Sequence, residues 1–180
     1  MTKINKILVI TFLIVFMDQI SKIIIRTSLN INAGIKVLGN FFKITHVEND
    51  GAAWSILNGK TLFLIILSLL FLLFIFNCIR KDFRNTKLNI LSYSFLVGGI
   101  VGNMIDRIIY GRVTDFLSFR IFNYNFPVFN IADIFIVIGM FMLITDLFLE
   151  GKEKGVLDED YKKIKEGKNE KNKSRRYRKH

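Results

Sequence analysis

The chain has 180 residues, of which 51% are hydrophobic and 18 are phenylalanine, and its formal net charge is +11 at pH 7. This length suits one domain, and the apolar content exceeds that of an ordinary soluble domain. The single cysteine, Cys78, excludes an internal disulfide. With His46 far from it in sequence, it is a poor basis for metal or thiol chemistry. We interpret Cys78 as a packing residue at the end of a helix.

The apolar residues gather in four long blocks, at about residues 7–25, 62–79, 90–109 and 131–149. Each block is about 18 to 20 residues long, the length that a helix needs to cross roughly 30 Å of hydrocarbon. We therefore predict an all-α membrane protein, with a four-helix transmembrane bundle over residues 1–150.

The first block also has the Lys-rich start and the apolar run of a cleavable signal peptide. However, no small-x-small cleavage site follows it, and Asp18 and Lys22 interrupt its far end. We interpret the block as an uncleaved transmembrane helix. Because Asp18 and Lys22 are spaced i, i+4, we expect them to form an ion pair on one helix face, near the outer interface.

The cations that flank the blocks predict the orientation of the chain. If the blocks alternate in direction, one side receives the basic segments before the first block, between the second and third, and after the fourth. Cations on the other side are spread over longer loops. We therefore expect both termini in the cytoplasm, with loops 26–61 and 110–130 outside.

The tail from Glu150 onward carries twelve Lys or Arg against seven acids. Because it directly follows an apolar helix, we interpret it as a juxtamembrane polybasic segment that faces anionic lipid. No recognition motif for nucleic acid accompanies the charge, so we expect no nucleic-acid binding. We expect residues 151–180 to be a basic, disordered cytoplasmic tail.

The outer loop 26–61 has patterns of its own. Phe42 and Ile44 alternate with polar residues as in a short strand, and residues 48–51 are a turn signal. A short apolar segment with Trp54 follows. It suits a small helix or lid at the membrane surface.

Polar residues and glycines form two adjacent rows in the third block. The rows are Gly99, Asn103 and Arg107, and Gly98, Gly102 and Asp106. Close helix contact explains Gly98 and Gly102. Three strong polar groups exceed what packing requires, so we expect Asp106 and Arg107 each to have a partner on another helix.

Two aspartates lie at the outer ends of the last two blocks, Asp115 just past the third and Asp133 just inside the fourth. Helix capping by Asn130 and a favourable helix dipole at Asp133 are one sufficient explanation of that motif, and Asp115 has a comparable explanation as a turn residue. The short loop between the aspartates nevertheless brings both to the same side at similar depth, where a carboxylate is costly. They therefore predict a pair that shares a proton and activates water.

Five motifs follow one another in order: Asp-Gln-Ile-Ser-Lys at 18–22, Asn-Asp-Gly-Ala-Ala-Trp at 49–54, Gly-Gly-Ile-Val-Gly-Asn-Met-Ile-Asp-Arg at 98–107, Val-Thr-Asp-Phe at 113–116 and Phe-Asn-Ile-Ala-Asp at 129–133. Together they resemble lipoprotein signal peptidase, the type II signal peptidase of bacteria, over about residues 7–150. The resemblance implies an intramembrane aspartic endopeptidase of the cytoplasmic (inner) membrane, without metal or cofactor. Its active site is implied to lie near the outer leaflet, under a small extracytoplasmic β cradle and a lid helix.

The resemblance also implies roles for individual residues. Asp115 and Asp133 match the catalytic pair. The residues that match those lining or supporting the substrate pocket are Asn49, Gly99, Asn103, Arg107, Asn130, Asp18, Lys22 and Trp54. The implied substrate is a prolipoprotein with a diacylglyceryl-modified cysteine, cleaved on the amino side of that cysteine. We expect a monomer whose partners are this substrate and membrane lipids.

Two other classes of function compete with a peptidase. A small transporter or channel requires polar residues that continue to the cytoplasmic side, and the second and fourth blocks supply almost none. A non-enzymatic assembly factor would tolerate Asp→Asn changes at both aspartates, because hydrogen bonding would be largely kept.

Overall fold

The structure is a computed structural model that describes the chain except for residues 1, 52–56, 82–85 and 178–180. The chain divides into two compact units, Met1–Leu143 and Ile144–His180. The candidate site lies wholly in the first unit. The expected lid with Trp54 falls outside the described residues.

Among the described residues, four helices are long and apolar enough to cross a membrane. They are α1 (Lys3–Ser28), α2 (Thr61–Lys81), α3 (Lys87–Tyr110) and, within α4 (Ile131–Tyr177), the stretch Ile131–Lys152. Each helix contains the corresponding apolar block, so the four expected spans are confirmed. Their ends extend a few residues beyond the blocks because flanking polar residues cap them, as Thr86 does for α3.

The end of the chain differs from the expected disordered tail, because α4 continues as a helix to Tyr177. Lys and Glu, which dominate this segment, are good helix formers. The only proline of the chain, Pro127, lies before α4, so no residue after Ile131 removes a helical N–H.

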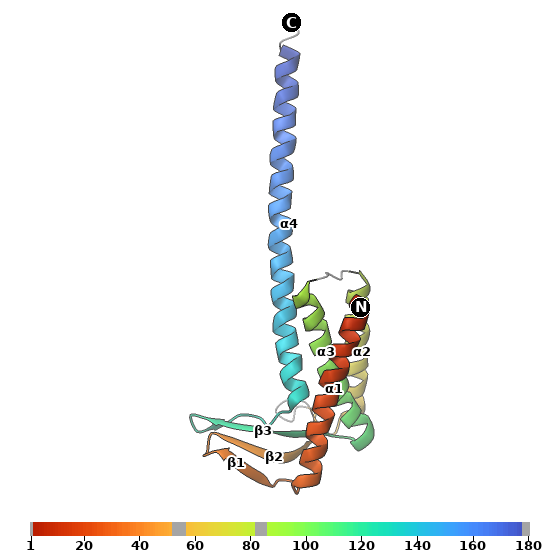
Figure 1. Ribbon diagram of the computed structural model, residues 1–180, viewed down its shortest axis with the longest axis vertical. Helices are drawn as coiled ribbons and strands as arrows, with labels where there is room; N and C mark the ends of the chain where they lie inside the picture. The colour runs from red at the N-terminus through yellow and green to blue at the C-terminus, as the bar shows by residue number, and fades with distance from the viewer. Residues whose placement is uncertain (1, 52–56, 82–85, 178–180) are drawn as a thin grey trace. The chain divides into compact units, whose positions relative to one another are not determined.

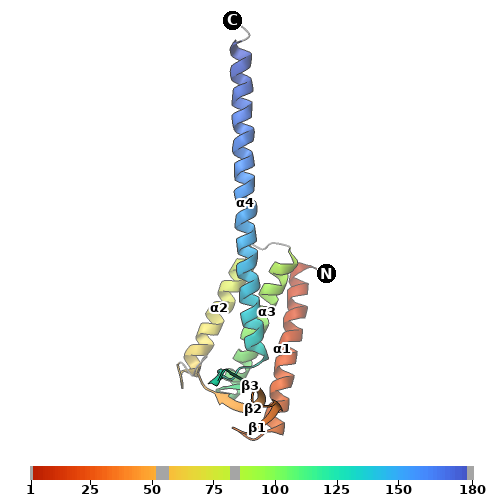
Figure 2. The same cartoon turned by 90° about the vertical axis from the view of Figure 1, so that its left-hand side faces the viewer.

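In the described part of the chain, four strands form one antiparallel sheet in the order β1-β2-β3-β4. They are β1 (Gly34–Leu38), β2 (Phe42–Asn49), β3 (Val113–Ile121) and β4 (Tyr124–Asn125). The alternation at Phe42 and Ile44 correctly predicted β2. Within the first unit, the sheet lies across the C-terminal ends of α1 and α3 (Figures 1 and 2).

Strand β3 was not predicted from the local pattern, and a turn residue was one of the two explanations offered for Asp115. Apolar residues occur on both faces of β3, since Leu117 and Phe116 are neighbours, and this obscures the period of two that marks a half-buried strand. The strand is defined by its partner β2, where Val47 pairs with Asp115 and Asn49 with Val113.

Glycines allow α3 to lie close to both α1 and α4. A Cβ at Gly98 would lie 2.7 Å from Cγ2 of Ile14 in α1, and a Cβ at Gly102 would lie 2.6 Å from Oδ2 of Asp18. A Cβ at Gly99 would collide with the carbonyl oxygen of Ala132 in α4. The predicted close-contact role of Gly98 and Gly102 is therefore confirmed.

Helix α3 ends at a glycine that leads directly into β3. Gly111 has a φ of 74°, the left-handed conformation that glycine adopts without a steric penalty. Its amide donates to the carbonyl oxygen of Arg107. This tight ending brings Asp115 close to the end of the helix that carries Asn103 and Arg107.

Candidate functional site

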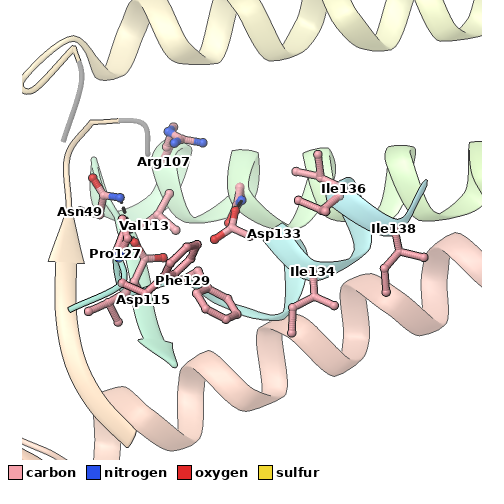
Figure 3. A pocket seen from close by; sticks show the side chains of 14 residues that line it. Asn49, Arg107, Val113, Asp115, Pro127, Phe129, Asp133, Ile134, Ile136 and Ile138 are labelled. Carbon is pink, nitrogen blue, oxygen red and sulfur yellow. Dashed lines mark hydrogen bonds between the residues drawn. The ribbon is translucent and has the colours of Figure 1, made fainter. Parts of the chain in front are cut away.

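A cavity of about 490 Å³ lies where α3, the start of α4 and the sheet meet (Figure 3). Its volume is within the range of small-molecule and peptide side-chain pockets. Its wall is mostly apolar, with Phe and Pro from residues 126–129 and isoleucines from the first turns of α4. The polar lining residues are Asn49, Asn103, Arg107, Asp115 and Asp133.

Asp115 enters the cavity from β3 and is buried. Its two carboxylate oxygens accept from the side-chain amides of two asparagines, Asn130 at 2.7 Å and Asn49 at 2.8 Å. Burial and the neighbouring Asp133 carboxylate raise the pKa of Asp115 to about 7, and the two amides only partly offset this rise. Asp115 is therefore able to hold a proton near neutral pH.

Asp133 enters the cavity from the first turn of α4 and forms a capping box with Asn130. The Asn130 side chain accepts from the Asp133 amide at 3.0 Å, and the Asp133 side chain accepts from the Asn130 amide at 3.1 Å. The predicted N-cap is thus confirmed. Capping engages one carboxylate oxygen, while the other accepts from Asn103 at 2.7 Å.

Asn130 connects the two aspartates without itself lining the cavity. Its side chain is fully buried, and its amide nitrogen reaches both Asp115 and, at 3.1 Å, the Asn103 oxygen. Its backbone contacts Asp133, as described above. One residue therefore sets the relative position of both carboxylates.

Arg107 lines the cavity but is bonded differently from what was expected. Its guanidinium donates to the carbonyl oxygen of Gly51 at 3.1 Å, so its described hydrogen-bond partner lies in the loop after β2 and not on another helix. The partner on another helix that was expected for Arg107 is present only as an electrostatic interaction with Asp133 of α4, because the long side chain reaches past the helices to the loop after β2. Its charge remains close to the cavity.

A buried cluster of charges lies beside the cavity. Lys22 pairs with Asp18 at 2.9 Å and with Asp106 at 3.4 Å, and Arg26 pairs with Asp106 at 3.4 Å. The expected Asp18–Lys22 pair and the helix partner expected for Asp106 are therefore both confirmed. The pair is fully buried and belongs to a larger cluster with Asp106 and Arg26, so it is not a separate, self-neutralising pair.

The charge cluster contacts the site on three sides. Lys22 donates to the Asn103 oxygen at 2.9 Å, and Asp18 accepts from the Ala132 amide at the start of α4 at 2.9 Å. Asp106 accepts from the Thr114 amide, beside Asp115, at 3.0 Å. The cluster thus holds α3, α4 and β3 in register around the carboxylates.

Four described residues that the resemblance assigned to the pocket do not line it, and one of them is Asn130, described above. Asp18 and Lys22 are in the charge cluster, and Gly99 packs against α4. Trp54 lies outside the described residues. Asp18, Lys22, Gly99 and Asn130 therefore support the residues that line the cavity.

Two contributors were missed from the sequence. Arg26 follows Asp18 and Lys22 at the same i, i+4 spacing, so its place in the cluster was readable from the helix period. The apolar wall at Phe126 and Phe129 had no such signal, because it depends on how residues 122–130 fold back onto β3. Phe129 exchanges backbone hydrogen bonds with Leu117 there.

The fold and the site together define a class of protein. In the described part of the chain, four membrane-length helices carry a sheet at one end, and a largely apolar cavity holds two carboxylates, of which Asp133 raises the pKa of Asp115. Such a pair is able to hold one proton and to act as both acid and base. The class is a multi-pass membrane protein with a site suited to acid–base chemistry.

Comparison with known proteins gives the family. The family model described as signal peptidase (SPase) II matches residues 10–149. A lipoprotein signal peptidase of Staphylococcus aureus (strain JH9) is 38% identical over 150 residues, which are 83% of this chain and 91% of the relative. The chain belongs to the signal peptidase II family and is therefore a peptidase-type hydrolase.

Solved structures agree with the fold. A bacterial membrane enzyme determined by the in meso method at 2.3 Å has a TM-score of 0.76 and 37% identity, covering 82% of this chain and 90% of its own. A second such structure, at 1.9 Å, has a TM-score of 0.72 and 38% identity, covering 80% and 93%. The predicted four-helix membrane fold with a small sheet is confirmed.

Proposed function

We propose that this protein is an aspartic endopeptidase that removes signal peptides from diacylglyceryl-modified prolipoproteins, cleaving on the amino side of the lipidated cysteine. The observation that carries the proposal is the placement of Asp115 and Asp133 on one apolar cavity, each fixed by asparagine amides. The name of the S. aureus relative supports the substrate class.

In the proposed mechanism, Asp115 holds the shared proton and Asp133 is ionised. The raised pKa of Asp115 supports this assignment, because a carboxyl with a pKa of about 7 is still protonated in a large fraction of molecules at neutral pH. Asp133 takes a proton from a water molecule, and that water attacks the scissile carbonyl carbon. Asp115 donates its proton to the carbonyl oxygen, giving a tetrahedral diol without a covalent enzyme intermediate.

Collapse of the diol completes the proposed reaction. The leaving amine takes a proton from Asp133, the C–N bond breaks, and Asp115 recovers its proton as the new carboxyl group forms. Arg107, Asn49 and Asn103 supply hydrogen-bond donors around this space, and most of the other lining side chains are apolar. Four apolar residues of α4 line the cavity, namely Ile134, Ile136, Val137 and Ile138, and they suit an apolar substrate segment and its acyl chains.

The proposed orientation places the sheet and cavity outside the cytoplasmic membrane and both termini inside. Lys3 and Lys6 precede α1, and the α2–α3 connection is also rich in cations, as the positive-inside rule requires. Under this orientation the cavity opens near the outer leaflet, where a translocated lipoprotein precursor would be anchored by its acyl chains.

The test is a gel-shift cleavage assay in detergent with purified diacylglyceryl-modified prolipoprotein. Asp115→Asn and Asp133→Asn should each lower the cleavage rate by more than about 100-fold, the scale of one acid–base catalyst. Glu48→Gln is the matched control, because Glu48 pairs with Arg112 at the surface and does not line the cavity. Near-normal cleavage by either Asn variant would refute the catalytic pair, and an inactive, folded wild type would favour a non-enzymatic role.

A further inference from the structure

The two hairpin ends of the sheet lie side by side, at the end of the sheet away from Asp115. Leu38 pairs with Phe42 where β1 turns into β2, and Phe42 pairs with Phe119 on β3. Two residues further along β3, Ile121 pairs with Tyr124 where β3 turns into β4. Both turns therefore lie at the same end of the sheet.

This end of the sheet exposes large apolar side chains. We call the following five residues the hairpin edge: Leu38, Phe41, Ile121, Phe122 and Tyr124. Each is at least 43% exposed, and Phe122 is 101% exposed. A contiguous apolar patch of this kind is rare on a surface that faces only water.

Phe122 is the clearest member, because neither the turn nor packing explains it. Phe122 and Asn123 are the two turn residues, with φ values of 46° and 64°. Two positive φ values in a two-residue hairpin turn favour Asn, Asp or Gly. A phenylalanine there carries a conformational cost, and its ring gains no contact area within the chain to offset it.

The sheet next to this edge is amphipathic. On one face, the Phe42 and Phe119 rings stack with centroids 4.6 Å apart, and Phe119 stacks on Phe129 of the cavity wall at 5.8 Å. Phe41 packs against Phe119 at 5.6 Å. An aromatic surface therefore runs from the cavity to the hairpin edge.

The opposite face of the same strands carries exposed cations. Lys36 pairs with Lys43 across β1 and β2, and Lys43 pairs with Ser118. Arg120, two residues beyond Ser118, shares this face because strand side chains alternate with a period of two. One aromatic and one cationic face is the pattern of an element that lies in the headgroup region of a membrane.

We propose that the hairpin edge inserts into the membrane interface at the sheet end of the helices, with Lys36, Lys43 and Arg120 at the level of the lipid headgroups. Continuity with the membrane-facing surface favours lipid over a protein partner. Strand β1 begins six residues after the last residue of α1, and β3 begins three residues after the last residue of α3. The sheet is thus tied closely to two helices that carry exposed apolar side chains.

This anchoring does not depend on the peptidase reaction. It fixes the height of the sheet, and with it Asp115, relative to the bilayer surface. It also makes the aromatic surface continuous with the lipid interface.

The proposal is tested by site-directed spin labelling of the full chain in lipid nanodiscs. In a Cys78→Ser background, Phe122→Cys and Lys36→Cys place one nitroxide on the hairpin edge and one on the cationic face. The label at 122 should relax more with oxygen, which concentrates in lipid, than with an aqueous nickel complex. The label at 36 should show the reverse, and equal access of the nickel complex to both labels would overturn the proposal.

A second measurement separates insertion of the protein from insertion of the label. A nitroxide at Phe41→Cys is compared with and without the double change Phe122→Ser and Tyr124→Ser. The double change should shift the label at 41 from oxygen toward nickel accessibility, and an unchanged label would overturn the proposal. Protection from both reagents, dependent on protein concentration, would also overturn it in favour of a contact between copies.

Discussion

At the scale of the residue, the site depends on three asparagines. Asn49, Asn103 and Asn130 each donate an amide to one of the two aspartates, at 2.7 or 2.8 Å. Hydrogen bonds to a carboxylate favour its ionised form, whereas burial favours the neutral form. For Asp115 burial prevails, so the asparagines fix its position more than its charge.

The pH dependence of stability follows from Asp115. Its pKa is 3.8 ordinarily and about 7 in the folded protein, so between these values the folded chain binds more protons than the unfolded chain. Stability therefore falls as pH rises through this window. We expect the midpoint temperature of thermal unfolding in detergent to decrease as the pH is raised from 3.8 to about 7. The decrease should be smaller in Asp115→Asn.

Glu48→Gln is the control for this experiment, because it removes a carboxyl that bonds to Arg112 and does not line the cavity, and the fall of the thermal midpoint should persist in it. An Asp115→Asn variant with the same slope as the wild type would show that Asp115 titrates normally. Measurements by intrinsic fluorescence across the pH range would suffice, since the comparison is between variants at each pH.

The sequence predicted some of these residue contacts and not others, for a physical reason. The capping box joins Asn130 and Asp133, three residues apart on a helix end, and such local geometry is fixed by the backbone. The contact between Asn49 and Asp115 joins residues 66 apart in sequence. It depends on the register of β2 against β3, which no local pattern determines. The family resemblance assigned Asn49 and Asp115 to the same site but did not predict the hydrogen bond between them.

At the scale of the element, the contact between α3 and α4 determines where Asp133 lies. Gly99 on α3 faces Ala132 and Ile136, and Gly139 on α4 faces Phe95 and Leu96. Small residues on both helices allow the backbones to approach closely. The helical period of the sequence predicted the packing role of Gly98 and Gly102, but not that of Gly99, which the resemblance assigned to the pocket. Strand β3 escaped prediction because its pattern is apolar on both faces.

Gly99→Ala tests this contact. A Cβ at Gly99 would meet a backbone oxygen, which cannot rotate away, so α4 has to shift and Asp133 shifts with it. We expect a loss of about 1–3 kcal/mol of stability, typical of overpacking, together with loss of cleavage. Circular dichroism melting and the cleavage assay measure the two effects.

Gly151→Ala is the matched control for Gly99→Ala. A Cβ at Gly151 would meet nothing within 4 Å, so the same change there should leave activity intact. If Gly99→Ala were also fully active and equally stable, close approach of α3 and α4 would not be required for the site.

At the scale of the whole molecule, the site and the basic tail belong to different parts of the chain. The cavity is lined by residues between Asn49 and Ile138, all inside the matched family region 10–149. The tail after Glu150 lies beyond that region. Its composition predicts contact with anionic lipid, whereas its helical backbone did not follow from its charge.

Deletion of residues 156–180 tests this division. Because no residue of the cavity is removed, the shortened chain should cleave at the wild-type rate in detergent. In vesicles with anionic lipid, the isolated tail peptide should bind, and the binding should weaken with added salt. A strong loss of cleavage in detergent would show that the tail contributes to the site, and salt-independent binding would refute an electrostatic attachment.

The buried charge cluster has a consequence for how the protein is made. Asp18 and Lys22 neutralise each other on α1, so the first helix to leave the ribosome enters the bilayer with its own counter-charge. Asp106 on α3 has no such partner in its own helix among its described ion pairs, and it arrives later, when Lys22 and Arg26 are already in place. Because chains are synthesised from the N-terminus, Lys22 and Arg26 always enter the bilayer before Asp106. The Asp106 carboxylate therefore meets its cationic partners on insertion and is not left unpaired in lipid.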